Sequence, residues 1–177
     1  MSESVHKHRE SAPERVRVAV LTISDTRTHE TDTGGDTVEN LMRASGHDIV
    51  ARDIVGDEAS SIRTKLVDLL ARPDVDAVVT TGGTGISARD TTYEVVDRML
   101  DKRLDGFGEI FRMLSYEEIG AAAVLSRAVA GAVGTKFVVC LPGSRNAVRL
   151  AVEKLLAPEI SHVVFELRKH NKHKEGR

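Results

Sequence analysis

The segment from residue 75 to residue 94, VDAVVTTGGTGISARDTTYE, constrains the fold more than any other part of the chain. It begins with an apolar run typical of a buried strand, and the loop 80–85 that follows carries almost no side-chain bulk. A T-x-x-E pattern at Thr91 and Glu94 predicts a capping box and therefore a helix start just after the loop. A strand that leads through a glycine loop into a helix is typical of parallel α/β folds.

The rest of the chain alternates between strands and helices in the same way. Apolar, β-branched runs predict strands at 16–23, 48–55, 75–80, 128–133 and 136–141, the last two around Gly134. Periodic apolar residues predict helices at 36–45, 58–71, 107–114, 115–125, 145–156 and 159–168. Ser115 and Ser144 are the expected caps of two of these helices, and Pro158 is expected to separate the last two. The alternation predicts an α/β fold with three layers (αβα), in which a mostly parallel sheet carries a small β-hairpin.

Length and cysteine content indicate one self-sufficient domain. The 177 residues favour a single domain, expected at 15–168, between a disordered tail at 1–14 and a basic tail at 169–177. One cysteine rules out an internal disulfide. Cys140 lies in an apolar strand pattern and is expected to be a small buried hydrophobe rather than a nucleophile.

Composition argues against two classes of partner. The chain has 25 basic and 27 acidic residues, a net charge of −2, and no tryptophan, so we expect no nucleic-acid binding. It has no apolar stretch of 18 residues and no signal-peptide core, so we expect no membrane association and a cytoplasmic location.

Four strand ends are expected to meet at one edge of the sheet, where α/β folds bind their ligands. The glycine loop is one of them, and its N–H groups could approach an anion because glycine has no Cβ. The loop matches neither the P-loop nor the G-x-G-x-x-G pattern, and a tight strand-to-helix turn would also need glycines. The four ends are Ser24-Asp25, Gly56-Asp57, residues 81–85, and Pro142-Gly143-Ser144.

Three carboxylates follow the strands at this edge, namely Asp25, Asp57 and Asp90. Magnesium is usually held by one or two carboxylates together with substrate phosphates, so a phosphorylated ligand with Mg²⁺ is one interpretation. The alternative is that these aspartates are turn or cap residues. Arg112 could hold a phosphate or lie on a solvated helix face. With no nucleophile–histidine motif, phosphoryl or nucleotidyl transfer fits the residues present, because it needs mainly positioning and charge neutralisation.

Several of these motifs together resemble the MoaB/MogA family of molybdopterin-binding proteins. The resemblance covers residues 15–168. The motifs that carry it are LTISD at 21–25, VGDE at 55–58, TTGGTG at 80–85 with RDTTYE at 89–94, FRMLSYEEIG at 111–120, LSRA at 125–128 and LPGS at 141–144.

The resemblance implies a function and a set of site residues. Active members bind molybdopterin and adenylylate it with Mg·ATP: the phosphate of molybdopterin attacks the α-phosphate of ATP and pyrophosphate leaves, before molybdate is inserted. Asp57 and Asp90 match the family's catalytic aspartates and would hold Mg²⁺ through substrate phosphates. The remaining predicted substrate and phosphate site is Ser24, Asp25, Thr81, Gly82, Gly83, Thr84, Gly85, Glu94, Arg112, Ser115, Pro142, Gly143 and Ser144.

The resemblance also implies partners and leaves a second function open. It implies a homo-oligomer, trimer or hexamer, that works with other proteins of molybdenum cofactor biosynthesis. The almost uncharged stretch 119–133 is consistent with a subunit contact, and equally with an internal helix and strand. The alternative function is a non-catalytic molybdopterin-binding or scaffold protein of the same pathway, and a dinucleotide phosphatase is a weaker third.

Overall fold

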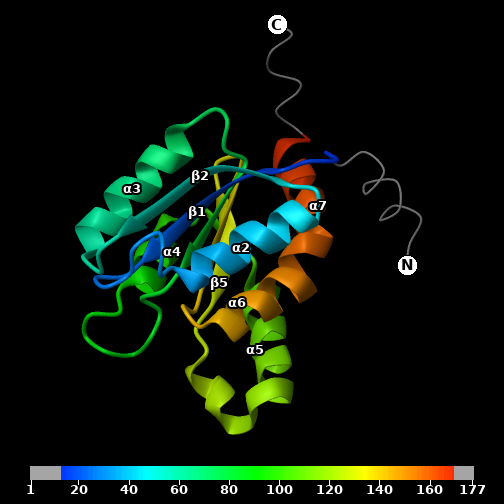
Figure 1. The fold of residues 1–177 in the computed structure, drawn as a ribbon. Helices are drawn as coiled ribbons and strands as arrows, with labels where there is room; N and C mark the ends of the chain where they lie inside the picture. Colours follow the sequence, from blue (N-terminus) through cyan, green and yellow to red (C-terminus); the bar gives the residue numbers. More distant parts are fainter. Residues whose placement is uncertain (1–12, 170–177) are drawn as a thin grey trace, which may run out of the picture.

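A computed structural model describes residues 13–169 of the chain (Figure 1). The predicted tails 1–14 and 169–177 lie almost wholly outside the described residues, so their predictions and the domain limits stay predictions. The described residues form one six-stranded sheet between helices, with the strand order β2-β1-β3-β6-β5-β4. The predicted three-layer α/β fold is confirmed.

The sheet is parallel over four strands and antiparallel over the last two. The parallel strands are β1 (Arg17–Ile23), β2 (Asp48–Val55), β3 (Ala77–Thr81) and β6 (Lys136–Leu141). β5 (Val129–Val133) pairs antiparallel with β6, as the predicted hairpin requires, and also with β4 (Lys102–Arg103). β4 was not predicted, because two exposed charged residues carry no strand periodicity.

Two apolar cores, one on each face of the sheet, hold the layers together. In β1, Val18 and Val20 face one core, while Ala19 and Leu21 face the other, as period-two alternation requires. The first core packs against α2 (Thr33–Ala44), α5 (Asp105–Ile119), α6 (Arg145–Ala151) and α7 (Ala157–Arg168). The second packs against α3 (Ala59–Ala71) and α4 (Thr92–Met99). In Figure 1, α5 extends well beyond the end of the sheet.

Ser115 and Pro158 do not mark the helix boundaries that were predicted for them. Ser115 does not begin a helix: it lies inside α5, its hydroxyl donates to the carbonyl of Phe111 at 2.8 Å, and a 3-10 helix, Gly120–Leu125, follows. Pro158 does not separate two helices, because a π-helical turn, Val152–Leu156, joins α6 directly to α7. Pro158 lies in the first turn of α7. The predicted Ser144 cap is confirmed, since its hydroxyl accepts from the N–H of Ala147 at 3.3 Å.

Candidate functional site

The strand ends predicted to converge do so around β1 and β3. The chain reverses its direction of travel across the sheet between these two strands, because β2 lies on one side of β1 and β3 on the other. Such switch points leave a crevice at the carboxyl ends of the strands. A cavity of about 200 Å³ occupies this place, between the ends of β1 and β3, the start of α2, and Gly143.

Backbone packs against backbone at the floor of this crevice. Gly82 has φ +100°, and a Cβ built on it would lie less than 3.0 Å from the carbonyl oxygen of Ile23. A Cβ on Gly143 would lie 3.1 Å from the Cα of Gly82. The Thr81 hydroxyl donates to the carbonyl of Pro142 at 3.2 Å. Glycine is therefore required at 82, where the loops after β3 and β6 meet.

The glycine loop keeps unpaired donors at its centre. Among the described residues, the N–H groups of Gly83 and Thr84 have no hydrogen-bond acceptor, although Thr84 is buried. The carbonyl of Gly83 accepts from the N–H of Thr92, which anchors the loop to the start of α4 at 3.0 Å. Adjacent free N–H groups in a positive-φ turn form a concave anion site. The predicted phosphate-binding role of residues 81–85 stays a prediction, with this geometry in its favour.

The two predicted catalytic aspartates lie beside the loop and differ in whether their carboxylates are hydrogen-bonded within the protein. A Cβ on Gly83 would be 3.2 Å from the Asp57 Oδ1, and the Asp57 carboxylate has no hydrogen-bond or ion-pair partner among the described residues. The Asp90 Oδ2 accepts from the N–H of Ser87 at 3.1 Å and from its hydroxyl at 2.6 Å. These bonds from Ser87, together with one from the N–H of Gly85, hold the pKa of Asp90 below its usual range. Asp57 is free to bind a ligand, whereas Asp90 closes the loop on itself.

Both carboxylate oxygens of Asp25, just after β1, form contacts within the protein. Its Oδ1 accepts from the N–H of Asp57 at 3.1 Å, and its Oδ2 pairs with Arg89. Ser24 accepts from the N–H groups of Thr26 and Arg27, each at 3.2 Å, and borders the crevice. The Asp25 carboxylate is thus already hydrogen-bonded within the protein and paired with Arg89, and its predicted place in the substrate site stays a prediction.

The start of α2 forms the other wall of the crevice and was missed by sequence reasoning. The helix begins at Thr33 instead of 36, capped by Asp32, whose Oδ1 accepts from the N–H of Gly35 at 2.9 Å. Asp32 is 2% exposed, and it is held by Thr22 at 2.7 Å and by Arg52 at 3.1 Å. In the sequence, Asp32 stands three residues before Gly35, as a helix cap would. This cap was not predicted, because the two consecutive glycines at 34 and 35 are poor helix formers.

The helix start predicted at Thr91 is confirmed, because Thr91 is the N-cap of α4, but the predicted capping-box bonds are absent. Thr91 precedes α4 but makes no side-chain cap bond, and its hydroxyl donates to the carbonyl of Asp57 at 3.2 Å. Glu94 pairs instead with Arg127, which lies just before β5. Arg127 is a site residue that sequence reasoning missed, although it lies in the LSRA motif, because its partners are remote in sequence.

Three residues of the predicted substrate site share a second cavity. Ser115, Pro142 and Ser144 line a cavity of about 160 Å³ between α5 and the start of α6. Gly143, between them in sequence, faces the crevice instead. The turn after β6 therefore borders both cavities.

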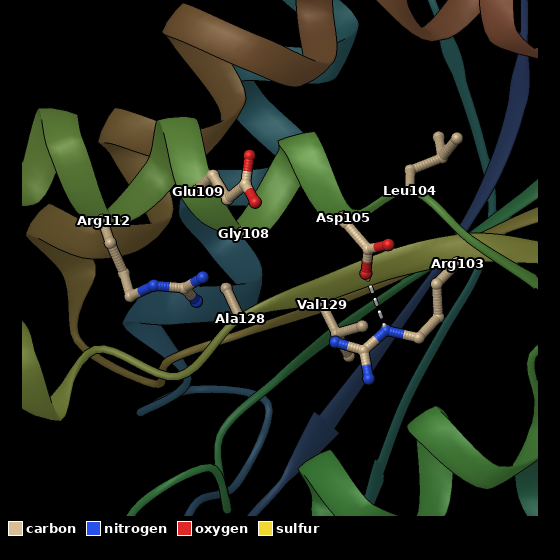
Figure 2. Close-up of a pocket in the computed structure, with 8 residues that line it drawn as sticks. All are labelled: Arg103, Leu104, Asp105, Gly108, Glu109, Arg112, Ala128 and Val129. Atoms are coloured by element: carbon tan, nitrogen blue, oxygen red, sulfur yellow. Dashed lines mark ion pairs between the residues drawn. The ribbon is translucent and has the colours of Figure 1, made fainter.

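Arg112 lies apart from the glycine loop. Figure 2 shows it on α5, pointing into a third cavity of about 220 Å³ that also borders Ala128 and the ion pair between Arg103 and Asp105. No residue of the glycine loop lines this cavity. Arg112 has no ion-pair partner among the described residues, and its predicted phosphate contact stays a prediction.

The family that this chain matches agrees with the α/β fold, the crevice at the switch point and the glycine loop. The model of the family described as "Probable molybdopterin binding domain" matches residues 19–162, and the chain belongs to this family. The resemblance to the MoaB/MogA family is thereby confirmed.

Named relatives match along almost their whole length. Molybdenum cofactor biosynthesis protein B of Bacillus cereus is 49% identical over 165 residues, 93% of this chain and 98% of that protein. The protein of the same name from Halalkalibacterium halodurans is 50% identical over 167 residues, 94% of this chain and 98% of that protein.

Solved structures agree with the fold. A crystal structure of molybdenum cofactor biosynthesis protein B superimposes with a TM-score of 0.87 at 49% identity, covering 90% of this chain and 99% of that one. The tungsten cofactor synthesizing protein MoaB from Pyrococcus furiosus gives a TM-score of 0.78 at 36% identity, covering 89% and 99%. No helix among residues 13–169 is long and apolar enough to cross a membrane.

Proposed function

We propose that this protein binds molybdopterin and adenylylates it with Mg·ATP in molybdenum cofactor biosynthesis. The observation that carries the proposal is the free carboxylate of Asp57 beside the unpaired N–H groups of Gly83 and Thr84. An anion cradle next to an uncommitted carboxylate suits a metal–phosphate ligand. The names of the relatives supply the pathway.

In this proposal the chain's own groups mainly position the reactants. The N–H groups of the loop bind the phosphates of ATP, and the crevice below Gly82 and the cavity lined by Ser115 offer room for the pterin. The phosphate oxygen of molybdopterin forms a bond to the α-phosphorus of ATP, and the bond from that phosphorus to the bridging oxygen of the leaving pyrophosphate breaks. Phosphoryl chemistry of this kind depends on alignment and charge neutralisation.

The donor set fits magnesium as a substrate-borne ion. Among the described residues no group of three or more His, Cys, Asp or Glu side chains could hold a metal by itself. Magnesium needs only one or two carboxylates when substrate phosphates complete its shell, and Asp57 offers a free one. When bound, the ion would neutralise charge that develops on the phosphates. Asp90, whose pKa is lowered, is ionised beside it at neutral pH.

The test is direct. The purified protein is incubated with molybdopterin, ATP and Mg²⁺, and pyrophosphate and the adenylylated pterin are quantified by chromatography and mass spectrometry. We expect stoichiometric formation of both products, and formation about 100- to 1,000-fold slower in Asp57→Asn. Absence of product at protein concentrations well above those of the substrates would reject the catalytic role.

One observation favours a non-catalytic binding role as the second candidate. The carboxylate of Asp90 is already occupied by Ser87, as expected for a loop-closing residue. A scaffold protein would bind molybdopterin and not ATP. Isothermal titration calorimetry with each ligand separates the two functions, because the enzyme must bind both.

We further propose that the protein is a homo-oligomer, trimer or hexamer. Four side chains at successive turns of α5 are 45–64% exposed: Ile110, Met113, Tyr116 and Ile119. Such a stripe is unlike a solvated helix face. Only part of the stretch 119–133 can form a subunit contact. Its β5 residues 129–132 are buried within the chain, whereas Val124 and Leu125 are exposed. Size exclusion with light scattering, for wild type and Met113→Glu, tests this: a 19.3 kDa mass for the wild type would reject it.

A further inference from the structure

We propose that Arg127 is the positioning residue of the glycine loop, fixing the peptide after Gly85 so that the free N–H groups of the loop keep their orientation. The consequence for phosphate binding rests on the proposed function. The effect on the loop itself does not, and it can be measured without any ligand.

Arg127 contacts the glycine loop and the start of α4, both more than 30 residues before it in the sequence. Its Nη1 donates to the carbonyl of Gly85 at 3.2 Å, and its Nη2 donates to the Glu94 carboxylate. The guanidinium carbon lies 4.4 Å from the centre of the Tyr93 ring. One side chain at the entrance to β5 thus holds the glycine loop and the first turn of α4 together. The planar fork of arginine allows these contacts to be made at once.

Gly85 is bordered by charged side chains on two sides. Its carbonyl accepts from Arg127, and the Asp90 Oδ2 would lie 2.6 Å from a Cβ built on Gly85. Because glycine populates a wide range of backbone angles, Gly85 does not restrict its own peptide orientation, and contacts from neighbouring side chains must do so. Without Arg127, the peptide after Gly85 would be free to rotate and the loop would sample orientations that disperse its N–H donors.

The charge of Arg127 is neutralised within the protein. Glu94 is its ion-pair partner, and the Arg127 side chain is only 25% exposed. A neutralised guanidinium is poorly suited to attract a ligand phosphate, whereas it can still orient a carbonyl. A positioning role and a direct phosphate contact therefore predict opposite results for Glu94→Gln. If Arg127 bound phosphate directly, removal of its counter-ion would strengthen binding. If Arg127 positions the loop, loss of its anchor would weaken binding.

The experiment compares Arg127→Met, Arg127→Lys and Glu94→Gln with a matched control, Arg103→Met. Methionine is an unbranched side chain that lacks both the donors and the charge of arginine. Arg103 also forms an ion pair with α4, through Asp97 at 2.8 Å, and it contacts the Tyr93 hydroxyl at 3.4 Å, but it has no contact with the glycine loop. The control therefore reports what the loss of any arginine beside α4 does to the fold.

Amide hydrogen exchange of residues 82–90 in the ligand-free protein is the first readout. We expect exchange to be at least about tenfold faster in Arg127→Met, the factor carried by one charge-assisted hydrogen bond. Arg103→Met should leave this segment unchanged. Arg127→Lys, which retains one donor and the charge, should recover part of the protection. Exchange in Arg127→Met equal to that of the control would overturn the proposal.

Calorimetric titration with Mg·ATP is the second readout. We expect weaker binding in both Arg127→Met and Glu94→Gln, with melting temperatures no lower than that of Arg103→Met. Tighter binding in Glu94→Gln would overturn the positioning role in favour of direct contact. If the wild type binds no Mg·ATP while Arg127→Met still exchanges faster, the proposed adenylylation fails and the positioning role stands.

Discussion

The contact between Gly82 and Ile23 makes the strongest prediction about the stability of the site. Gly82→Ala forces alanine into φ +100° and places its Cβ less than 3.0 Å from the carbonyl oxygen of Ile23. That oxygen belongs to the backbone of β1, so no side-chain rotation can relieve the overlap. The substitution therefore meets two penalties, one conformational and one steric.

The two penalties can be separated with a control. A left-handed conformation costs a non-glycine residue about 1–2 kcal/mol, and overpacking in a rigid interior costs about 1–3 kcal/mol more. Gly46 has φ +87° with no atom within 4 Å of its built Cβ, so Gly46→Ala carries only the first penalty. In a chain of this size each kcal/mol lowers the melting temperature by about 2–4 °C.

The assay is thermal and urea-induced unfolding of the two variants beside the wild type. Gly46→Ala is expected to lose about 1–2 kcal/mol of unfolding free energy, and Gly82→Ala about 2–5 kcal/mol. Equal loss in the two variants would refute the reasoning, because it would mean that the β3 loop moves away from β1 without resistance.

Four further predictions follow from side chains that are buried, already hydrogen-bonded or free. Asp57→Asn is expected to lower turnover about 100- to 1,000-fold, as for removal of one transition-state contact, without lowering the melting temperature. Asp90→Asn should lower that temperature, because it disturbs the bonds from Ser87, and an unchanged value would contradict the loop-closing role. Cys140 should resist thiol reagents at pH 8 until the protein unfolds, because complete burial raises its pKa to about 12, and fast labelling of the native state would contradict this. Burial lowers the pKa of His47, so neutral His47 stabilises the fold fully above the unfolded pKa of about 6.5, and this stabilisation is lost as the pH falls below that value. From pH 7.5 to 5, the unfolding free energy should therefore fall less in His47→Gln than in the wild type. Parallel curves for the two proteins would refute this.

The sequence predicted that several strand ends meet at one edge of the sheet, but not which of their carboxylates are already hydrogen-bonded. Residues 81–85, Asp57 and Asp90 do lie together, because parallel strands deliver their carboxyl ends to one edge. The sequence could not show that the Asp57 carboxylate is free and that the Asp90 carboxylate is occupied. Both residues are aspartates near a glycine loop, and only the path of residues 86–90 decides which of them bends back onto Ser87.

Local patterns were misleading where a distant partner offered a stronger contact. Glu94 matches a capping box three residues after Thr91, yet it pairs with Arg127, 33 residues further along the chain. Ser115 also matches a capping box, but Phe111 of the same helix is fully buried in the core and keeps α5 continuous through this point. Ionic pairing and core burial outweigh a cap of about 1 kcal/mol.

The layers of the fold, and the edge of the sheet at which the strand ends meet, follow from local patterns in the amino-acid sequence. Strands that are apolar on both faces must be covered by helices on both sides, and Gly82 must be glycine wherever its backbone takes φ +100°. The tertiary structure alone decided which helix start closes the crevice, where Asp32 is buried against Thr22 and Arg52, and which arginine holds the loop. The physical reason is range: hydrophobic periodicity and turn propensity act within a few residues, whereas these ion pairs and hydrogen bonds join residues 10 to 42 positions apart.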